Sequence, residues 1–190
     1  VIHNGNGKYE RISRRLLYCG HVIITKGVIE LVEACRKIPN IELRIVGKCA
    51  LDIKEQMLTI AKQSGNNTSW LNFVGEVPHD EVIREFFQAD MFVFPSYTEG
   101  FPNVILAAVA CGCTLVSSDV GEIPEMLDID GDACGICFKA RNTDEVYNAV
   151  CSLIGNDVLK HTLSAKAMER VNNLYAMTVV WQEILKICNQ

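Results

Sequence analysis

The sequence predicts an α/β fold, a Rossmann-like doubly wound parallel sheet of about six strands with helices on both faces. Short apolar runs alternate with stretches of helical periodicity along the 190 residues, which is the pattern of repeated β-α-β units. The run at residues 91–94 is apolar throughout, as a strand buried on both faces is. Glycines and polar residues directly follow the apolar runs, at the edge where such sheets bind ligands.

The expected strands are short apolar runs that end at glycine or another turn residue. The first ends at Gly20, the second at Gly47, and the third includes Gly75. The fully apolar fourth strand is expected to be central. The expected strands, in order, are residues 16–19, 41–46, 71–75, 91–94, 114–117 and 135–138.

The expected helices repeat apolar residues at helical spacing between and after these strands. Pro39 and Asn40 stop the first helix, and His79 opens the third. A loop of serine, glycine and two asparagines closes the second helix. The expected helices, in order, are residues 29–38, 51–62, 79–89, 103–111, 143–154, 157–172 and 177–188.

Size and composition suit one globular domain and exclude several classes of function. A chain that is 49% hydrophobic over 190 residues forms a sizeable core. The formal net charge of −5 argues against a nucleic-acid partner, which requires a basic stripe. No apolar run approaches the roughly 18 residues of a membrane-spanning helix, and the first residues contain no signal-like stretch. We therefore expect a cytoplasmic protein.

Polar residues after the first and fourth strands form the predicted ligand site. Gly20-His21 and then Lys26-Gly27 follow the first strand, where a lysine and the N–H groups of a helix N-terminus attract phosphate. Glu99 and Gly100 follow the fourth strand, and glycine lets the backbone approach a ligand closely. Acceptors for hydroxyls beside donors for phosphate oxygens suit a sugar diphosphate. The alternative is that Glu99 is a solvated turn residue at the start of the next helix.

The segment from Glu99 to Gly112 resembles the signature of the group 1 retaining glycosyltransferases, a GT-B family. It reads Glu-Gly-Phe-Pro-Asn-Val-Ile-Leu and runs into Ala-Cys-Gly. Supporting matches lie in order over about 125 residues, at residues 1–5, 20, 26–27, 73–75, 89–90 and 121–125. The resemblance implies that residues 1–190 are the nucleotide-sugar-binding C-terminal half of a GT-B fold, with a linker-like segment at 1–15 and a terminal helix at 176–190.

The resemblance also implies a reaction and a site. The reaction is transfer from a nucleoside-diphosphate sugar to an acceptor, with retention at the anomeric carbon and without metal or other cofactor. Glu99 would accept hydrogen bonds from the donor sugar and is the candidate catalytic residue. Lys26 would bind the diphosphate, and Val77 would lie near the nucleobase. The remaining expected donor-binding residues are Gly20, His21, Gly27, Gly100, Phe101, Pro102 and Asn103.

The expected partners are a UDP- or GDP-sugar and the N-terminal domain of the same parent protein. That domain would hold an acceptor sugar or lipid of unknown identity, and it would allow peripheral attachment to the cytoplasmic face of a membrane. Without it, this chain is expected to bind donor and to transfer nothing, because catalytic closure requires both halves.

Two positions depart from the family pattern. The family has a second glutamate, which grips the ribose hydroxyls, eight residues after the first, and that position is Ala107. Losing hydrogen bonds to a charged acceptor weakens binding roughly 10- to 150-fold. The family's arginine beside the first glycine is His21. Diphosphate binding is therefore expected to strengthen as the pH falls through about 6.5. The alternative is that His21 only fills the loop and Lys26 binds phosphate alone.

Three classes of function fit these residues. The first is the donor half of an active transferase. The second is a degenerate or regulatory homologue that binds donor weakly or not at all and acts through protein contacts. The third is another GT-B enzyme, such as a nucleotide-sugar epimerase, which the segment at residues 99–103 disfavours. Retention of both Lys26 and Glu99 favours the first class.

Two further patterns suggest metal sites, and neither is complete. Cys134 and Cys137 have the C-x-x-C spacing of zinc ligands, but no second pair or set of histidines accompanies them. Nine cysteines at irregular spacing suit free thiols in a reducing cytosol. Asp128 and Asp130 form the D-x-D of metal-dependent GT-A transferases, but a solvated acidic turn is expected there. No metal site is predicted.

Overall fold

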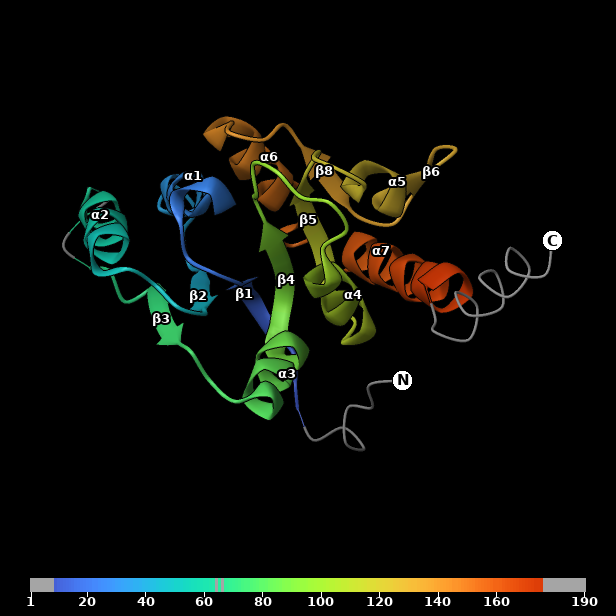
Figure 1. Cartoon of the computed structure of the whole chain (residues 1–190), viewed down its shortest axis with the longest axis horizontal. Helices are drawn as coiled ribbons and strands as arrows, with labels where there is room; N and C mark the ends of the chain where they lie inside the picture. The colour runs from blue at the N-terminus through green and yellow to red at the C-terminus, as the bar shows by residue number, and fades with distance from the viewer. Residues whose placement is uncertain (1–8, 64, 66, 176–190) are drawn as a thin grey trace.

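A six-stranded parallel sheet organises the protein. The computed structural model describes residues 9–63, 65 and 67–175. The strand order is β3-β2-β1-β4-β5-β8 (Figure 1). The strands are β1 (Ile12–Cys19), β2 (Glu42–Val46), β3 (Leu71–Gly75), β4 (Ala89–Phe94), β5 (Thr114–Ser118) and β8 (Ile136–Phe138). All five neighbouring pairs are parallel, which confirms the predicted doubly wound α/β fold.

Helices cover both faces of this sheet (Figure 1). One layer contains α1 (Val28–Cys35), α2 (Leu51–Lys62) and α6 (Thr143–Leu153), with α1 in contact with both of the others. The other layer contains α3 (His79–Gln88), α4 (Asn103–Ala110) and α7 (Asp157–Arg170), with α4 in contact with both of the others. Right-handed crossovers that run in opposite directions along the sheet place their helices on opposite faces, so α1 and α2 lie on one face and α3 and α4 lie on the other.

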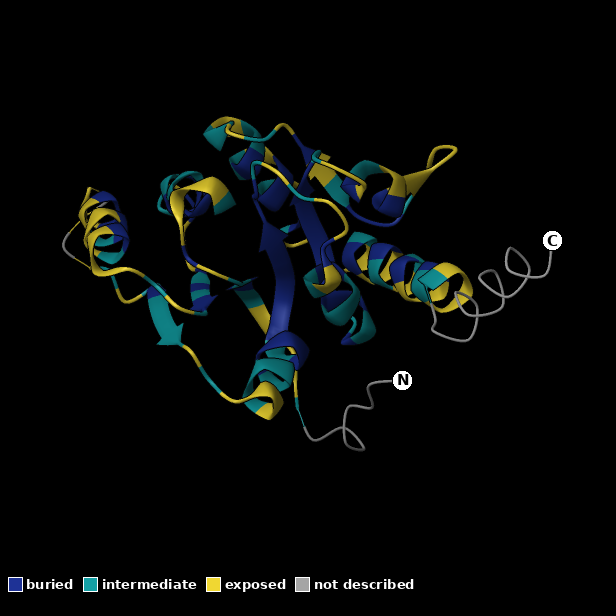
Figure 2. Cartoon of the chain, viewed as in Figure 1, coloured by how far each residue is buried: buried dark blue, intermediate teal, exposed yellow. Residues whose placement is uncertain are grey.

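The core lies along the two central strands. Every residue of β4 and β5 is buried, and both strands are dark blue in Figure 2. Phe92 packs edge to face on Phe86 of α3 with 5.3 Å between ring centroids. Such aromatic pairs add roughly 0.5–1.5 kcal/mol beyond the burial of their area. The carboxyl ends of these strands are therefore held on a rigid base.

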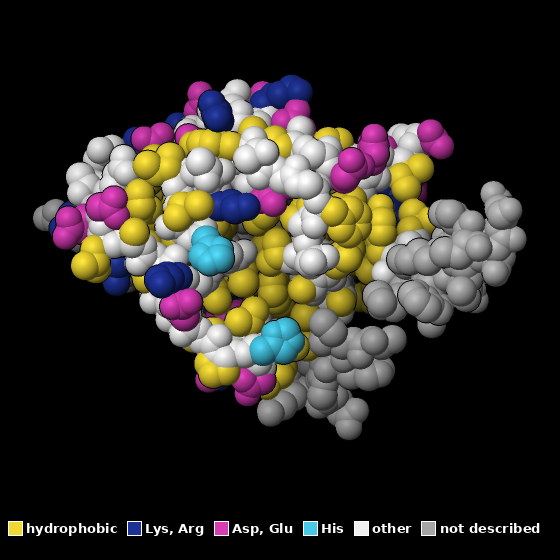
Figure 3. Space-filling view, in the orientation of Figure 1, with side chains coloured by type: hydrophobic (Ala, Val, Ile, Leu, Met, Phe, Trp, Pro, Cys, Tyr) yellow, Lys and Arg dark blue, Asp and Glu magenta, His cyan; other side chains and the backbone are white. Residues whose placement is uncertain are grey.

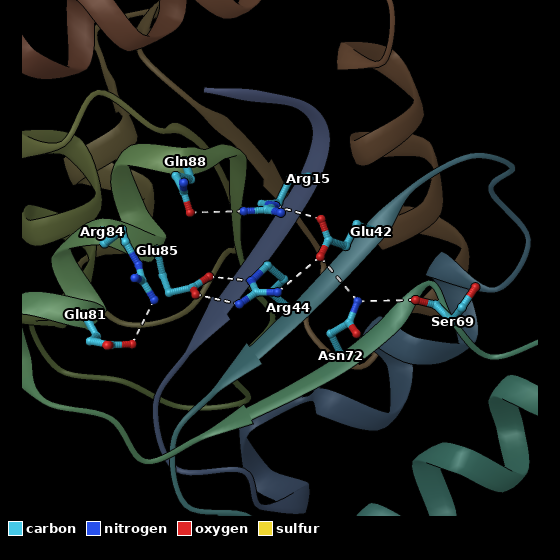
Figure 4. A network of polar contacts seen from close by, with 9 residues as sticks. All are labelled: Arg15, Glu42, Arg44, Ser69, Asn72, Glu81, Arg84, Glu85 and Gln88. Atoms are coloured by element: carbon cyan, nitrogen blue, oxygen red, sulfur yellow. Dashed lines mark hydrogen bonds and ion pairs between the residues drawn. The ribbon is translucent and has the colours of Figure 1, made fainter. Parts of the chain in front are cut away.

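The sheet meets α3 partly through charges rather than apolar side chains. Arg44 of β2 donates to both carboxylate oxygens of Glu85 at 2.5 and 2.6 Å (Figure 4). Glu85 is 2% exposed, and such two-pronged pairs fix geometry as well as charge. Glu42 accepts from Arg15 at 2.7 Å and from Arg44 at 3.2 Å. Together with the bond from Arg15 of β1 to Gln88, this network ties α3 to β1 and β2.

The structure departs from the predicted elements at several boundaries. Strand β1 begins at Ile12, four residues early and inside the segment expected to be linker. Its first half was missed because it is polar, and Arg15 reaches Glu42 and Gln88 there. Helix α1 ends at Cys35, three residues early, because the chain turns before Pro39.

Short elements after β5 were not fully predicted. Helix α5 (Ile123–Leu127) precedes a hairpin of β6 (Asp128–Ile129) and β7 (Asp132–Ala133). Strands of two residues are too short to show periodicity. The expected helix at 177–188 lies outside the described residues. Within the described part, every helix is too short or too polar to span a bilayer.

Candidate functional site

The sheet has its topological switch point between β1 and β4. From β1 the chain moves outward to β2 and β3, and from β4 it moves the other way to β5. The loops after β1 and β4 therefore diverge and leave a crevice at the carboxyl ends of the strands. Lys26 follows β1 and Glu99 follows β4, so both predicted charges lie at this crevice.

The crevice contains an ion pair between its two predicted charged residues. The Lys26 ammonium donates to Glu99 Oε1 at 2.5 Å. Their side chains are 27% and 13% exposed, so the pair is partly shielded but open to a ligand. The ammonium also lies 5.9 Å from the ring centroid of Phe94. The cation and the carboxylate are thus adjacent and neutralise one another.

Close backbone contacts hold the two loops together. Lys26 ends a 3₁₀ turn, η1 (Ile24–Lys26), and Gly27 follows with a left-handed φ of 67°. A Cβ on Gly27 would lie 2.0 Å from the carbonyl oxygen of Pro95, so only glycine allows this approach. The Tyr97 N–H donates to the Thr25 carbonyl at 2.9 Å. The Lys26 loop is therefore fixed on the Glu99 loop.

The side chain of Tyr97 strengthens this connection. Its hydroxyl donates at 2.5 Å to Oε1 of Glu30, a residue of α1. Burial and the bond to Glu30 raise the pKa of Tyr97, so it stays a hydrogen-bond donor at neutral pH. The Arg141 guanidinium lies over its ring at 4.6 Å from the centroid. Tyr97 was not predicted, since a tyrosine in a loop gives no sequence signal of its own.

The first lobe of the cleft surrounds the ion pair and measures about 250 Å³. Its lining joins the ends of β1 and β4 to the start of α4, and consists of Tyr18, Cys19, Gly20, His21, Lys26, Phe94, Glu99, Pro102, Asn103 and Val104. The N-terminus of α4 lies at this lobe, and the first N–H groups of a helix lack acceptors within the helix. Hydrogen-bond donors, a cation and a carboxylate thus meet beside an apolar wall.

A second lobe of about 260 Å³ adjoins the first. The two share Cys19, Gly20 and His21, so they form one elongated cleft. The second lobe is lined in addition by Val46, Gly47, Lys48, Glu76, Val77 and Val82. Figure 3 shows a hollow with hydrophobic side chains in this face, and a histidine and Lys or Arg side chains around it.

The structure brings together most of the predicted site residues. Val77 lines the second lobe. The predicted residues that line the first lobe are Gly20, His21, Lys26, Glu99, Pro102 and Asn103. Gly27, Gly100 and Phe101 are not among the lining residues. Gly27 acts instead as the cap of α1 against Pro95, and the Phe101 ring lies 5.3 Å from that of Tyr175.

Two lining residues at the end of β1 were missed from sequence. Tyr18 donates its hydroxyl to the His21 carbonyl at 2.7 Å, which fixes the shared loop. Burial, with a smaller contribution from Glu85, raises the pKa of the Cys19 thiol to about 11. Cys19 is therefore a neutral part of the cleft at physiological pH. Both residues stand at the end of a strand beside the switch point, and that position was the sequence signal that could have identified them as lining residues.

The suspected metal patterns do not converge. No group of three or more His, Cys, Asp or Glu side chains able to hold a metal occurs in residues 9–63, 65 and 67–175. Cys134 is buried and Cys137 is exposed. Asp128 accepts from the Gly131 N–H at 2.9 Å in the exposed β6–β7 turn, as expected of an acidic turn.

Comparisons with known proteins agree with this geometry. The model of the family described as glycosyl transferases group 1 matches residues 13–156. The chain is 29% identical over 185 residues to the phosphatidyl-myo-inositol mannosyltransferase of Mycolicibacterium smegmatis, covering 94% of this chain and 46% of that protein. This chain spans about half the length of the curated relatives that it matches.

Solved structures share the fold. The C-terminal domain of the group 1 family glycosyl transferase LpcC from Francisella tularensis has a TM-score of 0.76 at 22% identity, with 90% of each chain covered. Alr3699/HepE from Anabaena, solved in complex with UDP, has a TM-score of 0.82 at 17% identity, covering 93% of this chain and 49% of that one. The sheet, its switch point and its helix layers are thus those of a GT-B C-terminal domain.

Proposed function

This chain belongs to the group 1 glycosyl transferases, and from that premise we propose that it binds the donor, a nucleoside-diphosphate sugar, for a retaining transfer that needs no metal. The observation that best supports the proposal is the ion pair of Lys26 and Glu99 across the switch point. A cation for phosphate and an acceptor for hydroxyls stand side by side there. The cleft extends from this pair to Val77, which gives room for a nucleoside.

In the proposed reaction, the bond between the anomeric carbon and the diphosphate oxygen breaks. The nucleoside diphosphate leaves, and an acceptor hydroxyl bonds to the same carbon and passes its proton to an oxygen of the departing diphosphate. Lys26 and the N–H groups of α4 offset the negative charge that grows on the leaving diphosphate. These groups supply the positive charge that a metal ion would otherwise provide. Glu99 exchanges its bond to Lys26 for hydroxyls of the sugar and so orients the reacting carbon.

In this proposal, the acceptor binds to a part of the complete protein that lies outside this chain. The chain spans about half the length of its curated relatives. We propose that a separate N-terminal domain of the parent protein holds the acceptor opposite the cleft. This chain alone would then bind donor without transferring it.

A degenerate or regulatory homologue is the second candidate. Ala107 lies half-buried on α4, where it packs against the core and offers no acceptor for a ribose hydroxyl. His21 lines both lobes in place of a permanent cation. The intact pairing of Lys26 and Glu99 favours a working donor site over this alternative.

The reaction is tested with the complete parent protein. It is supplied with UDP- and GDP-hexoses in the presence of EDTA, and donor hydrolysis or transfer to added acceptors is followed by NMR. We expect release of nucleoside diphosphate and a product with the donor's anomeric configuration. Glu99→Gln should reduce turnover at least about 10-fold. The exposed Glu55→Gln on α2 is the matched control and should leave it unchanged. Inversion, or turnover that survives Glu99→Gln, would contradict the proposal.

A further inference from the structure

The chain segments after β1 and β2 continue side by side into the cleft. Within the sheet, Cys19 is the register partner of Val46. Beyond it, a parallel bridge pairs Val22 with Cys49. The same sequence spacing separates both pairs, so the register of the two strands persists through the loops. The residues between the two pairs are therefore cross-strand neighbours at the mouth of the cleft.

His21 and Lys48 occupy one of these intervening positions, and both line the second lobe. The Val22 N–H donates to the Lys48 carbonyl at 2.9 Å, which ties the two segments together. A Cβ on Gly47 would lie 2.0 Å from the Gly20 carbonyl oxygen, so this glycine lets the segments approach closely. Neighbouring strands lie about 4.8 Å apart. One phosphate group can therefore contact both side chains.

The charges of the cleft are unequally paired. Lys26 is neutralised by Glu99 at 2.5 Å. Lys48 is exposed, and its ammonium forms no ion pair or hydrogen bond with any described residue. Glu76 lines the same lobe and is also exposed, without an ion pair to Lys48. The cation available to an incoming anion without breaking a bond is therefore Lys48.

We propose that Lys48 is a second phosphate-binding residue of the cleft, which acts beside His21 on the diphosphate that Lys26 reaches from the first lobe. This inference rests on the proposed function. Lys48 supplies, from the neighbouring strand, a positive charge next to the His21 ring. The diphosphate then spans the join of the two lobes, and the sugar extends toward Glu99.

The test is calorimetric titration of the 190-residue chain at pH 8 and 50 mM salt, with UDP, GDP, uridine and guanosine as probes. Lys48→Ala should weaken the nucleoside diphosphate that binds by roughly 3- to 10-fold, since the lysine is exposed and its charge is partly screened. Binding of the nucleoside, which lacks phosphate, should not change. Lys48→Arg should retain wild-type affinity within about 2-fold. Salt at 0.5 M should shrink the effect of Lys48→Ala, because screening shortens the reach of the charge.

Lys62→Ala on α2 is the matched control, because it removes the same charge from an exposed site outside both lobes. It should leave affinity within 2-fold of wild type. Two results for Lys48→Ala would overturn this inference: an unchanged affinity, or equal losses for nucleoside and nucleoside diphosphate. If Lys26→Ala still abolished binding, the proposed function would stand and only the inference would fail. If wild type bound neither UDP nor GDP, the proposed function would fail together with the inference.

Discussion

At the scale of single residues, the cleft depends on an ion pair that a bound donor would have to separate. Lys26 and Glu99 are bonded to one another in the structure. A bound donor would separate them, with phosphate on the lysine and hydroxyls on the carboxylate. The partial exposure of both side chains allows this exchange without unfolding either loop.

His21 predicts that a permanent charge at its position strengthens binding. It lines both lobes and is exposed, so its ring is accessible to a phosphate group. His21→Arg should raise nucleoside-diphosphate affinity several-fold at pH 8, because arginine carries a permanent charge and a forked set of donors. Calorimetric titration of wild type and the variant measures this, and an unchanged affinity would leave His21 a loop residue with Lys26 alone on the phosphate.

Cys19 predicts a dependence of thiol chemistry on pH and ligand. Its pKa of about 11 leaves little thiolate at pH 7.5, so iodoacetamide should label it slowly. Labelling should accelerate by about tenfold per pH unit up to pH 10, because the thiolate is the nucleophile. Saturating nucleoside diphosphate should slow it further, since Cys19 lines both lobes. Peptide mass mapping gives the rate, and an absence of ligand protection would place the diphosphate elsewhere.

At the scale of elements, the loops after β1 and β4 act as one unit. Gly27 packs on Pro95, and Tyr97 reaches both the Thr25 carbonyl and Glu30. The positions of Lys26 and Glu99 are therefore set by contacts between the loops as well as by the strands that precede them.

Tyr97→Phe tests this coupling. The change removes the hydroxyl's bond to Glu30, whose other carboxylate oxygen is already buried without a partner. We expect the free energy of unfolding to fall by about 1–3 kcal/mol. Nucleoside-diphosphate affinity should fall several-fold as the Lys26 loop loosens. Tyr147→Phe on α6, remote from the cleft lining, is the control. Reduced stability with unchanged affinity would show that the bond does not position the loop.

Sequence was sufficient for elements with a regular apolar pattern, and insufficient where contacts between distant segments decide. The central strand β4 and the glutamate after it were predictable because burial and local glycine have clear signals. The first half of β1 was not, since Arg15 is accommodated only by Glu42 and Gln88 from other elements. Likewise, Lys48 enters the cleft through a register that only the paired strands define.

At the scale of the whole molecule, stability and binding are located at opposite ends of the sheet. Asp90 at the start of β4 accepts from Lys160 of α7 at 2.7 and 2.8 Å, and both residues are buried. The backbone N–H of Arg14 donates to the same carboxylate at 2.8 Å. This pair fixes α7 on the sheet far from the loops that end in Lys26 and Glu99.

Asp90→Ala should therefore destabilise the fold and spare the site. Removing one partner of a buried pair costs about 3–5 kcal/mol, with the lower end expected because Lys160 retains Asp157 at 2.9 Å. Urea unfolding measures the loss. The affinity of the folded fraction for nucleoside diphosphate should stay within 2-fold of wild type. A comparable loss of affinity under conditions where the variant is folded would mean that the two ends are coupled.

The central claim is that the crevice at the switch point is a donor site in which Lys26 binds the diphosphate. Its most direct test is calorimetric titration of wild type and Lys26→Ala with UDP, GDP and their sugar conjugates at pH 6, with Lys62→Ala as control. The account predicts saturable binding of one nucleotide by wild type and the control, and a loss of at least about 10-fold in Lys26→Ala. Wild-type binding that survives Lys26→Ala, or none of these ligands bound at millimolar concentration, would contradict it.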